Sequence, residues 1–207
     1  NSMAGEIRTT TVPLIEHDFP AQAARAVAEL QASGSFAFKL RSAKVLAGLP
    51  TAEHNASVAA TAKGPAYLVV LVQYSLEPGL GAFTTRSTAM LWQGGQSEPA
   101  YRSSAIFQAP TVGASRAEVV KWLAADQGKV ITGLMHDSVA ETLQMVSADI
   151  ASPAAAANAQ ARAKQVNRFN HNGRWLEVQG AAVNKNGSRV VLQDQDGALF
   201  SLTGAKQ

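Results

Sequence analysis

The longest apolar run of the chain extends from Tyr67 to Leu76, and it constrains the possible folds more than any other stretch. Its centre, residues 68–72, has no polar alternation, and three of these five residues are valines, whose β-branched side chains favour a strand. A proline precedes the run and a Pro-Gly pair closes it, which gives it the length of a strand. Because a strand that is apolar on both faces is normally covered on both, we expect this run to be the central strand of a sheet with helices packed on it.

Apolar periodicities of two and of three to four residues flank this run and predict both strands and helices. Ser115 and Glu118 have the spacing of a capping box, which marks the start of a helix. The predicted fold class is therefore α/β (α+β), with a mixed sheet, helices packed on it, and a small carboxy-terminal antiparallel β meander. The expected strands are 7–15, 36–40, 66–76, 84–93 and 101–107, and the expected helices are 20–34, 51–63, 115–128 and 131–150. The predicted core comprises Leu68, Val70, Val72, Leu91, Ile106, Leu134, Leu143 and Val146.

The last quarter of the chain has a different pattern. Residues 152–164 are rich in alanine and are interpreted as a linker or a loosely packed helix. Three Asn-Gly or Asp-Gly pairs then follow at the spacing of hairpin turns, in which glycine supplies a positive φ. We therefore expect a four-stranded antiparallel meander over 165–203, and a division into an α/β domain at 4–151, a linker at 152–164 and a small β unit at 165–207.

Composition limits the functions that this chain can have. With 46% hydrophobic and 16% charged residues, the chain can form a packed core. The net charge of +3 is spread along the chain, without the run of like charges that marks a nucleic-acid-binding or membrane-binding tail. No apolar run reaches the roughly 18 residues of a membrane-spanning helix. The absence of cysteine excludes disulfides, thiolate zinc sites and a cysteine nucleophile.

The sequence contains no recognisable catalytic or metal-binding pattern. The His136-Asp137-Ser138 sequence contains the residue types of a catalytic triad, but neighbours on a helix point in different directions. There is no G-x-S-x-G nucleophile elbow. We therefore predict no catalytic residues, no cofactor and no bound metal. None of the four histidines has the spacing of a metal-binding pair: they are His17, His54, His136 and His171.

Large side chains at four positions are candidates for partner binding. Trp122 lies on a predicted helix and Trp175 in the predicted meander, and a single exposed tryptophan is a common interface anchor. Successive residues of a strand point to opposite faces, so Trp175 and Leu176 lie on opposite faces of the meander, and one face of the meander is expected to remain partly apolar. Phe200, also in the meander, is the fourth candidate. We expect these four residues to contact a second copy of the chain or another protein.

The predicted order of elements from Ile7 to Ile150 resembles that of a group of bacterial outer-membrane lipoproteins with a periplasmic α/β domain. These are the curli-secretion lipoproteins, the lipoprotein activators of penicillin-binding proteins and the amino-terminal domain of the Tol translocation protein. The resemblance rests on Val12-Pro13-Leu14 before a Pro-initiated helix, on the apolar strand at 66–76, and on Leu91-Trp92-Gln93-Gly94 at the end of the next strand. It implies a domain without catalytic activity.

The leading functional hypothesis is therefore a non-catalytic domain of the bacterial cell envelope that binds another envelope component or itself. We expect it in the periplasm, possibly anchored to the outer membrane. Asn1-Ser2-Met3 looks like an expression remnant, so a signal sequence or a lipidated cysteine could have preceded Ala4. Two alternatives remain open at this point: a small hydrolase or transferase with its site at the carboxyl ends of the strands, and a weak nucleic-acid-binding module.

Overall fold

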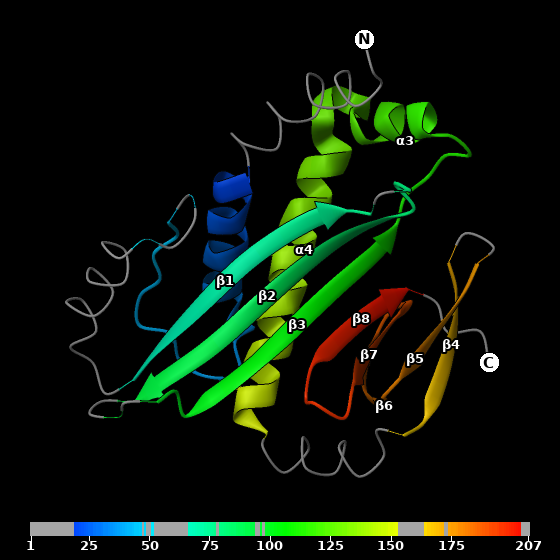
Figure 1. Ribbon diagram of the computed structural model, residues 1–207. Coiled ribbons are helices and arrows are strands. Elements are labelled where there is room, and N and C mark those ends of the chain that lie inside the picture. The colour runs from blue at the N-terminus through cyan, green and yellow to red at the C-terminus, as the bar shows by residue number, and fades with distance from the viewer. Residues whose placement is uncertain are drawn as a thin grey trace.

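The computed structural model describes residues 19–46, 48, 51, 66–77, 79–93, 96, 98–152, 164–171 and 174–203. The predicted strand 7–15, and almost all of the predicted helix 51–63 and linker 152–164, lie outside the described residues. The fold class is confirmed: helices pack on a mixed six-stranded sheet, and a small two-stranded antiparallel sheet lies beside it (Figure 1).

The large sheet has the strand order β1-β2-β3-β8-β7-β6. Neighbouring strands are antiparallel throughout, except that β3 and β8 run parallel. The strands, in that order, are Ala66–Leu76, Ala82–Gln93, Tyr101–Pro110, Leu199–Thr203, Arg189–Gln193 and Ala181–Asn186.

The apolar run forms β1, which lies at the edge of the sheet within the described residues and not at the predicted central position. Short connections join β1, β2 and β3 into an antiparallel meander. As the first strand of that meander, β1 has a described neighbour on one side only. The apolar run reflects the partial burial of side chains on both faces of β1. It does not indicate how many strands pair with β1.

Three helices of the described residues lie on one face of the sheet or at its end. They are the helix over 19–33, α3 (Arg116–Leu123) and α4 (Ala125–Ala151). In Figure 1, α4 crosses behind β1, β2 and β3, the helix over 19–33 runs beside it, and α3 lies at one end. The predicted capping box is present, because Ser115 Oγ accepts from the Glu118 N–H and Glu118 Oε2 accepts from the Ser115 N–H. The first predicted helix, 115–128, ends earlier than expected, at Leu123. The predicted break between the helices 115–128 and 131–150 is present as a kink inside α4, with a positive φ at 126–128.

The core lies between α4 and the sheet. The α4-facing side chains of β2 and β3 alternate with outward-facing ones, and several are small or carry hydroxyl groups. Two buried hydroxyl pairs link β2 to α4: Thr85 with Ser138 at 2.7 Å, and Ser87 with Thr142 at 2.8 Å. These contacts fix the position of α4 along the strand. Of the predicted core residues, Leu143 and Val146 are buried, whereas Leu68, Val70, Val72, Leu91, Ile106 and Leu134 are half-buried.

The carboxy-terminal segment contains five strands instead of the predicted four. The first two, β4 (Val166–His171) and β5 (Arg174–Gln179), form the separate hairpin, whereas β6, β7 and β8 extend the large sheet. The glycines of the second and third predicted turns, Gly187 and Gly197, have φ of 58° and 82° as expected. The division into units at 4–151 and 165–207 stays a prediction, because sharing a sheet does not show that two segments unfold together.

The predicted strand at 36–40 is not formed, and residues 35–46 are irregular. The side chain of Phe36 stacks on Phe38, with ring centroids 5.9 Å apart, and packs against the cluster between α4 and the helix over 19–33. The Ala37 N–H donates to Ser147 Oγ on α4 at 3.3 Å. These contacts with helices replace the strand pairing that the apolar alternation had predicted.

Candidate functional site

The sheet face opposite α4 carries apolar, aromatic and charged side chains. Alternation along β1, β2 and β3 directs every second side chain to this face, away from the helices. In Figure 1 no described element lies in front of these three strands. We call this surface the open face. Its apolar and aromatic residues, all half-buried, are Tyr67, Val69, Leu71, Met90, Trp92 and Ile106.

An aromatic pair lies at one end of the open face. Tyr67 and Trp92 are direct register partners on β1 and β2. Their ring centroids are 6.3 Å apart and their planes differ by 9°, so the rings are stacked. Both side chains are half-buried, which leaves part of each ring accessible. Rigid aromatic side chains of this kind contribute large contact areas to protein interfaces.

Two arginines supply the positive charge of the open face. Arg86 on β2 and Arg102 on β3 are both exposed. Arg102 lies beside Met90, with its Nη2 3.9 Å from the sulfur, and neither guanidinium forms an ion pair with a described residue. Thr88 and Ser104 are register partners between them. The guanidinium groups are thus free to form charge-assisted hydrogen bonds with a carboxylate or phosphate of a partner.

The open face ends where the small hairpin begins. Phe169 on β4 is fully buried against Leu192 and Leu202, and half-buried Val178 and Phe200 pack on this cluster. The hairpin of β4 and β5 therefore covers β7 and β8 on the side opposite α4, and leaves β1, β2 and β3 open (Figure 1).

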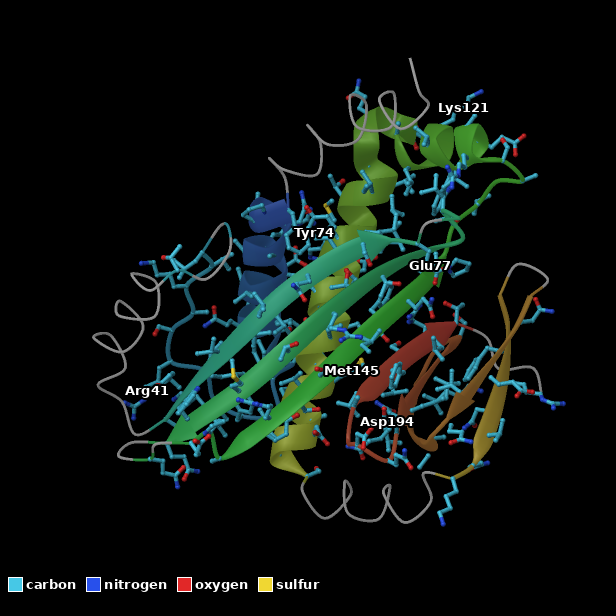
Figure 2. The ribbon with its side chains drawn as sticks, viewed as in Figure 1. Arg41, Tyr74, Glu77, Lys121, Met145 and Asp194 are labelled. Carbon is cyan, nitrogen blue, oxygen red and sulfur yellow. The ribbon has the colours of Figure 1, made fainter. Side chains whose placement is uncertain are left out.

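An acidic group lies at the border of the open face. Glu77, which directly follows β1 and is labelled in Figure 2, accepts a hydrogen bond from Gln108 Nε2 at 2.8 Å. Both side chains come from the end of the sheet that is remote from Tyr67 and Trp92. The positive charge thus lies within the face and the negative charge at its rim.

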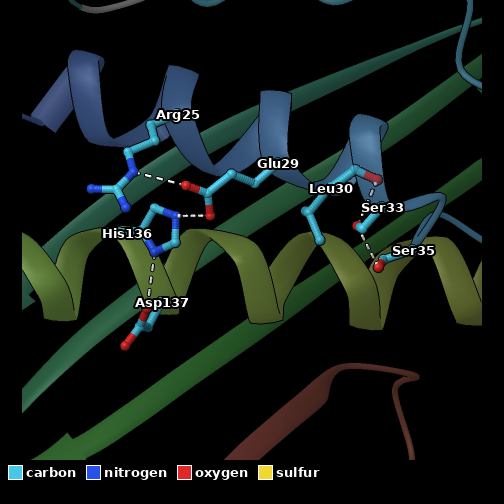
Figure 3. A network of polar contacts seen from close by, with 7 residues as sticks. All are labelled: Arg25, Glu29, Leu30, Ser33, Ser35, His136 and Asp137. Carbon is cyan, nitrogen blue, oxygen red and sulfur yellow. Dashed lines mark hydrogen bonds and ion pairs between the residues drawn. The ribbon is translucent and has the colours of Figure 1, made fainter.

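A second polar cluster joins the helix over 19–33 to α4 (Figure 3). His136 Nε2 lies 2.9 Å from Glu29 Oε2, and His136 Nδ1 lies 2.9 Å from Asp137 Oδ1. Glu29 also accepts from Arg25 Nε at 2.8 Å, and this hydrogen bond is the largest cause that lowers the pKa of Glu29. Ser138 points instead to Thr85 on β2. His136 and Asp137 therefore contact each other, although neighbours on a helix were expected to point in different directions, whereas Ser138 contacts Thr85.

A third polar cluster is largely buried between α4 and the carboxy-terminal strands. Arg189 Nε donates to Glu141 Oε1 at 3.1 Å, and both side chains are 14% exposed. Burial lowers the pKa of Arg189, and the charge of Glu141 opposes that shift. About two turns further along α4, the Tyr101 hydroxyl donates to Asp149 Oδ2 at 2.7 Å, and burial followed by this hydrogen bond raises the pKa of Tyr101. These groups hold α4 on the sheet and face away from the open face.

The structure does not bring the four sequence-predicted partner residues together. Trp122 on α3 is half-buried and packs on the core cluster around Leu123. Phe200 on β8 is half-buried beneath the β4–β5 hairpin. Trp175 and Leu176 lie in β5, and their side chains are outside the described part of the structure. That these residues bind a partner stays a prediction.

The sequence analysis missed the open face as a site. The alternation of Arg86, Thr88, Met90 and Trp92 nevertheless places these four on one side of β2. Within the described ranges, no group of three or more histidine, aspartate or glutamate side chains could hold a metal ion. None of the described helices has the length and apolar character needed to span a membrane.

No protein-family model matches this chain, and neither a curated protein nor a solved structure matches it.

Proposed function

We propose that this chain is a non-catalytic binding domain of the bacterial cell envelope, and that the open face of β1, β2 and β3 holds its partner. The location in the periplasm, with a tether to the outer membrane, rests on the resemblance to the lipoprotein families. The binding function rests mainly on one observation: half of a sheet face is covered by a hairpin, and the other half presents apolar, aromatic and cationic side chains without a described cover.

The chemistry of the face favours a protein with an acidic, partly apolar surface. Interfaces typically combine a central apolar and aromatic area with a polar rim, and tyrosine, tryptophan, methionine and arginine are enriched in them. All four residue types occur on the open face, in Tyr67, Trp92, Met90, Arg86 and Arg102. A carboxylate of the partner would gain charge-assisted hydrogen bonds with the arginines.

Site-specific photo-cross-linking in bacterial cells that produce the protein tests this proposal. A photoreactive amino acid replaces Thr88 at the centre of the open face or, as the control, Lys121 on α3, which is exposed on another part of the molecule. We expect a discrete adduct with an envelope protein from position 88 only, and its loss when Arg86→Glu or Met90→Asp is added. No adduct at position 88, or the same adduct from both positions, would contradict the proposal.

Single-stranded nucleic acid is a second candidate, because the same face combines stacked rings with guanidinium groups. Proteins that bind single strands use aromatic side chains to stack on bases and cations to contact the backbone. Fluorescence anisotropy with a labelled oligonucleotide distinguishes the two candidates. Binding that weakens steeply with salt and is lost in Arg86→Glu or Arg102→Glu, but not in the exposed control Arg168→Glu on β4, would favour nucleic acid.

A further inference from the structure

Four polar side chains form a compact group at the centre of the open face, which we call the polar array. Thr88 on β2 and Ser104 on β3 are direct register partners, and both are half-buried. Arg86 lies two residues before Thr88 on β2. Arg102 lies two residues before Ser104 on β3, so the four side chains share this face. Because β2 and β3 are antiparallel, the two arginines lie on opposite sides of the hydroxyl pair.

Both arginines can reach the hydroxyl pair. Residues two apart along a strand have Cα atoms about 6.8 Å apart, and an extended arginine side chain bridges this distance. The Arg102 side chain leans toward β2, since its Nη2 lies 3.9 Å from the sulfur of Met90, its register partner there. Within the described ranges, neither hydroxyl of the pair is hydrogen-bonded and neither guanidinium is ion-paired, so all four donor groups are available to a ligand.

Apolar side chains lie beside the polar array. Met90 and Ile106 are the register partners of the two arginines. Leu71 on β1 is the register partner of Thr88. All three apolar side chains are half-buried. They displace water around the array, and hydrogen bonds to a charged group are stronger where the local dielectric constant is lower.

We infer that the polar array binds a single carboxylate of the partner, which both arginines hold together with the two hydroxyls. A carboxylate accepts hydrogen bonds at two oxygens with about four lone-pair sites, which match the four donor groups of the array. Two guanidinium groups that converge without an anion repel each other, so a bound anion allows both of them to reach the hydroxyl pair. The apolar neighbours of the array fit an acidic side chain that is flanked by apolar residues in the partner.

The shared carboxylate site rests on the proposed function, and it adds that Arg86 and Arg102 hold the same anionic group. Acetate serves as the probe in the experiments below, which contain no partner protein. Acetate binding can therefore fail while the photo-cross-link at position 88 is retained, which refutes the shared site and leaves the binding face. A lost cross-link with intact acetate binding refutes the partner protein and leaves the carboxylate site.

Nuclear magnetic resonance titration with sodium acetate, at an ionic strength held constant with chloride, tests the site. The signals followed are the Nε–Hε groups of Arg86, Arg102 and Arg41. Arg41 is the matched control, because it is exposed, has no ion pair with a described residue and lies outside β1, β2 and β3 (Figure 2). We expect saturable shifts with one Kd at Arg86 and Arg102, and none at Arg41. Shifts that do not saturate, two different Kd values or an equal response of Arg41 overturn the inference.

Variants of the array test whether the two arginines share the anion, and both positions are exposed, so the substitutions leave the core intact. Arg86→Gln should raise the acetate Kd measured at Arg102 about fivefold, because it removes a charge-assisted hydrogen bond at an exposed site. Arg102→Gln should have the same effect on the Kd measured at Arg86, whereas Arg41→Gln should change neither value. An unchanged Kd at the remaining arginine shows two separate sites and overturns the inference. Binding of inorganic phosphate without binding of acetate overturns the assignment to a carboxylate and favours the phosphates of a nucleic acid.

Discussion

Arg189 on β7 connects the carboxy-terminal strands to the rest of the sheet and to α4. Its Nε donates to Glu141 Oε1 on α4, and its Nη2 donates to the Gln108 carbonyl on β3 at 2.8 Å. Nη2 also donates to the Ser201 carbonyl on β8 at 2.6 Å, and the guanidinium carbon lies 3.9 Å from the centroid of the Phe107 ring. We therefore expect Arg189→Met to destabilise the fold by leaving the Glu141 carboxylate without its cation.

The magnitude follows from the burial of this pair. Both side chains are 14% exposed, so solvent screens their interaction only slightly. Removing one partner of a buried pair costs roughly 3–5 kcal/mol, and we take about 3 kcal/mol because some solvent contact remains. Loss of the cation–π contact adds about 1 kcal/mol. The expected total of about 4 kcal/mol corresponds to a fall in Tm of about 8–16 °C for a chain of this size.

Urea unfolding, followed by far-ultraviolet circular dichroism and by tryptophan fluorescence, measures this effect. The double variant Glu141→Leu/Arg189→Met lacks both charges. It should regain at least half of the unfolding free energy that Arg189→Met loses, because replacing a whole buried pair by apolar residues is nearly neutral. Arg168→Met is the matched control, since its ion pair with Glu177 is 69% and 56% exposed and is worth at most about 1 kcal/mol.

Two results would refute this reasoning. A loss below about 1 kcal/mol in Arg189→Met would show that the pair contributes no more than a surface ion pair. A double variant as unstable as Arg189→Met would show that the uncompensated carboxylate is not the cause. The unfolding curves also test the predicted domain division, because two separate transitions would indicate that the carboxy-terminal unit unfolds independently of 4–151.

Three further predictions concern the core and the surface. Val70→Asp places a carboxylate between two apolar clusters and should cost about 3 kcal/mol or more, and an unchanged Tm would remove Val70 from the core. Thr142→Val deprives the buried Ser87 hydroxyl of its described partner and should cost about 1–3 kcal/mol in urea unfolding. Ser87→Ala should cost less, because Thr142 still donates to backbone carbonyls, and equal losses would contradict this. The hydrogen bond from Arg25 is the main cause that lowers the pKa of Glu29 below its ordinary value of 4.5. The pKa of Glu29 is thus lower in the folded than in the unfolded protein, so the ionised carboxylate stabilises the fold. At about pH 6 the wild type should therefore have a higher free energy of unfolding than Glu29→Gln, and this difference should disappear as the pH falls below 4.5. A difference in free energy of unfolding that does not depend on pH would contradict the prediction.

The sequence by itself determined the elements that depend on neighbouring residues. The capping box of Ser115 and Glu118, the break near Gly128 and the turn glycines Gly187 and Gly197 were all predicted correctly. Each of these features is specified by hydrogen bonds or backbone angles within a few residues. The α/β fold class followed for the same reason, because local periodicity distinguishes strands from helices.

Tertiary structure alone decided which strands are neighbours. The apolar pattern of β1 is compatible with a central or an edge strand. No pattern of neighbouring residues predicts that β8 pairs in parallel with β3. The segment around Phe36 has the alternation of a strand, but its contacts with α4 and the helix over 19–33 prevail. These outcomes depend on contacts between residues far apart in the chain, which periodicity does not encode.

The open face depends on both the local sequence pattern and the tertiary contacts. Alternation along β2 already places Arg86, Met90 and Trp92 on one side of the strand. That no described helix covers this side was decided by the position of α4, which the buried hydroxyl pairs with β2 hold on the other face. The extent of the face was decided by the β4–β5 hairpin, because burial of Phe169 against Leu192 holds that hairpin over β7 and β8. Sequence thus determines which side chains share a face, whereas packing between distant segments determines which faces remain open.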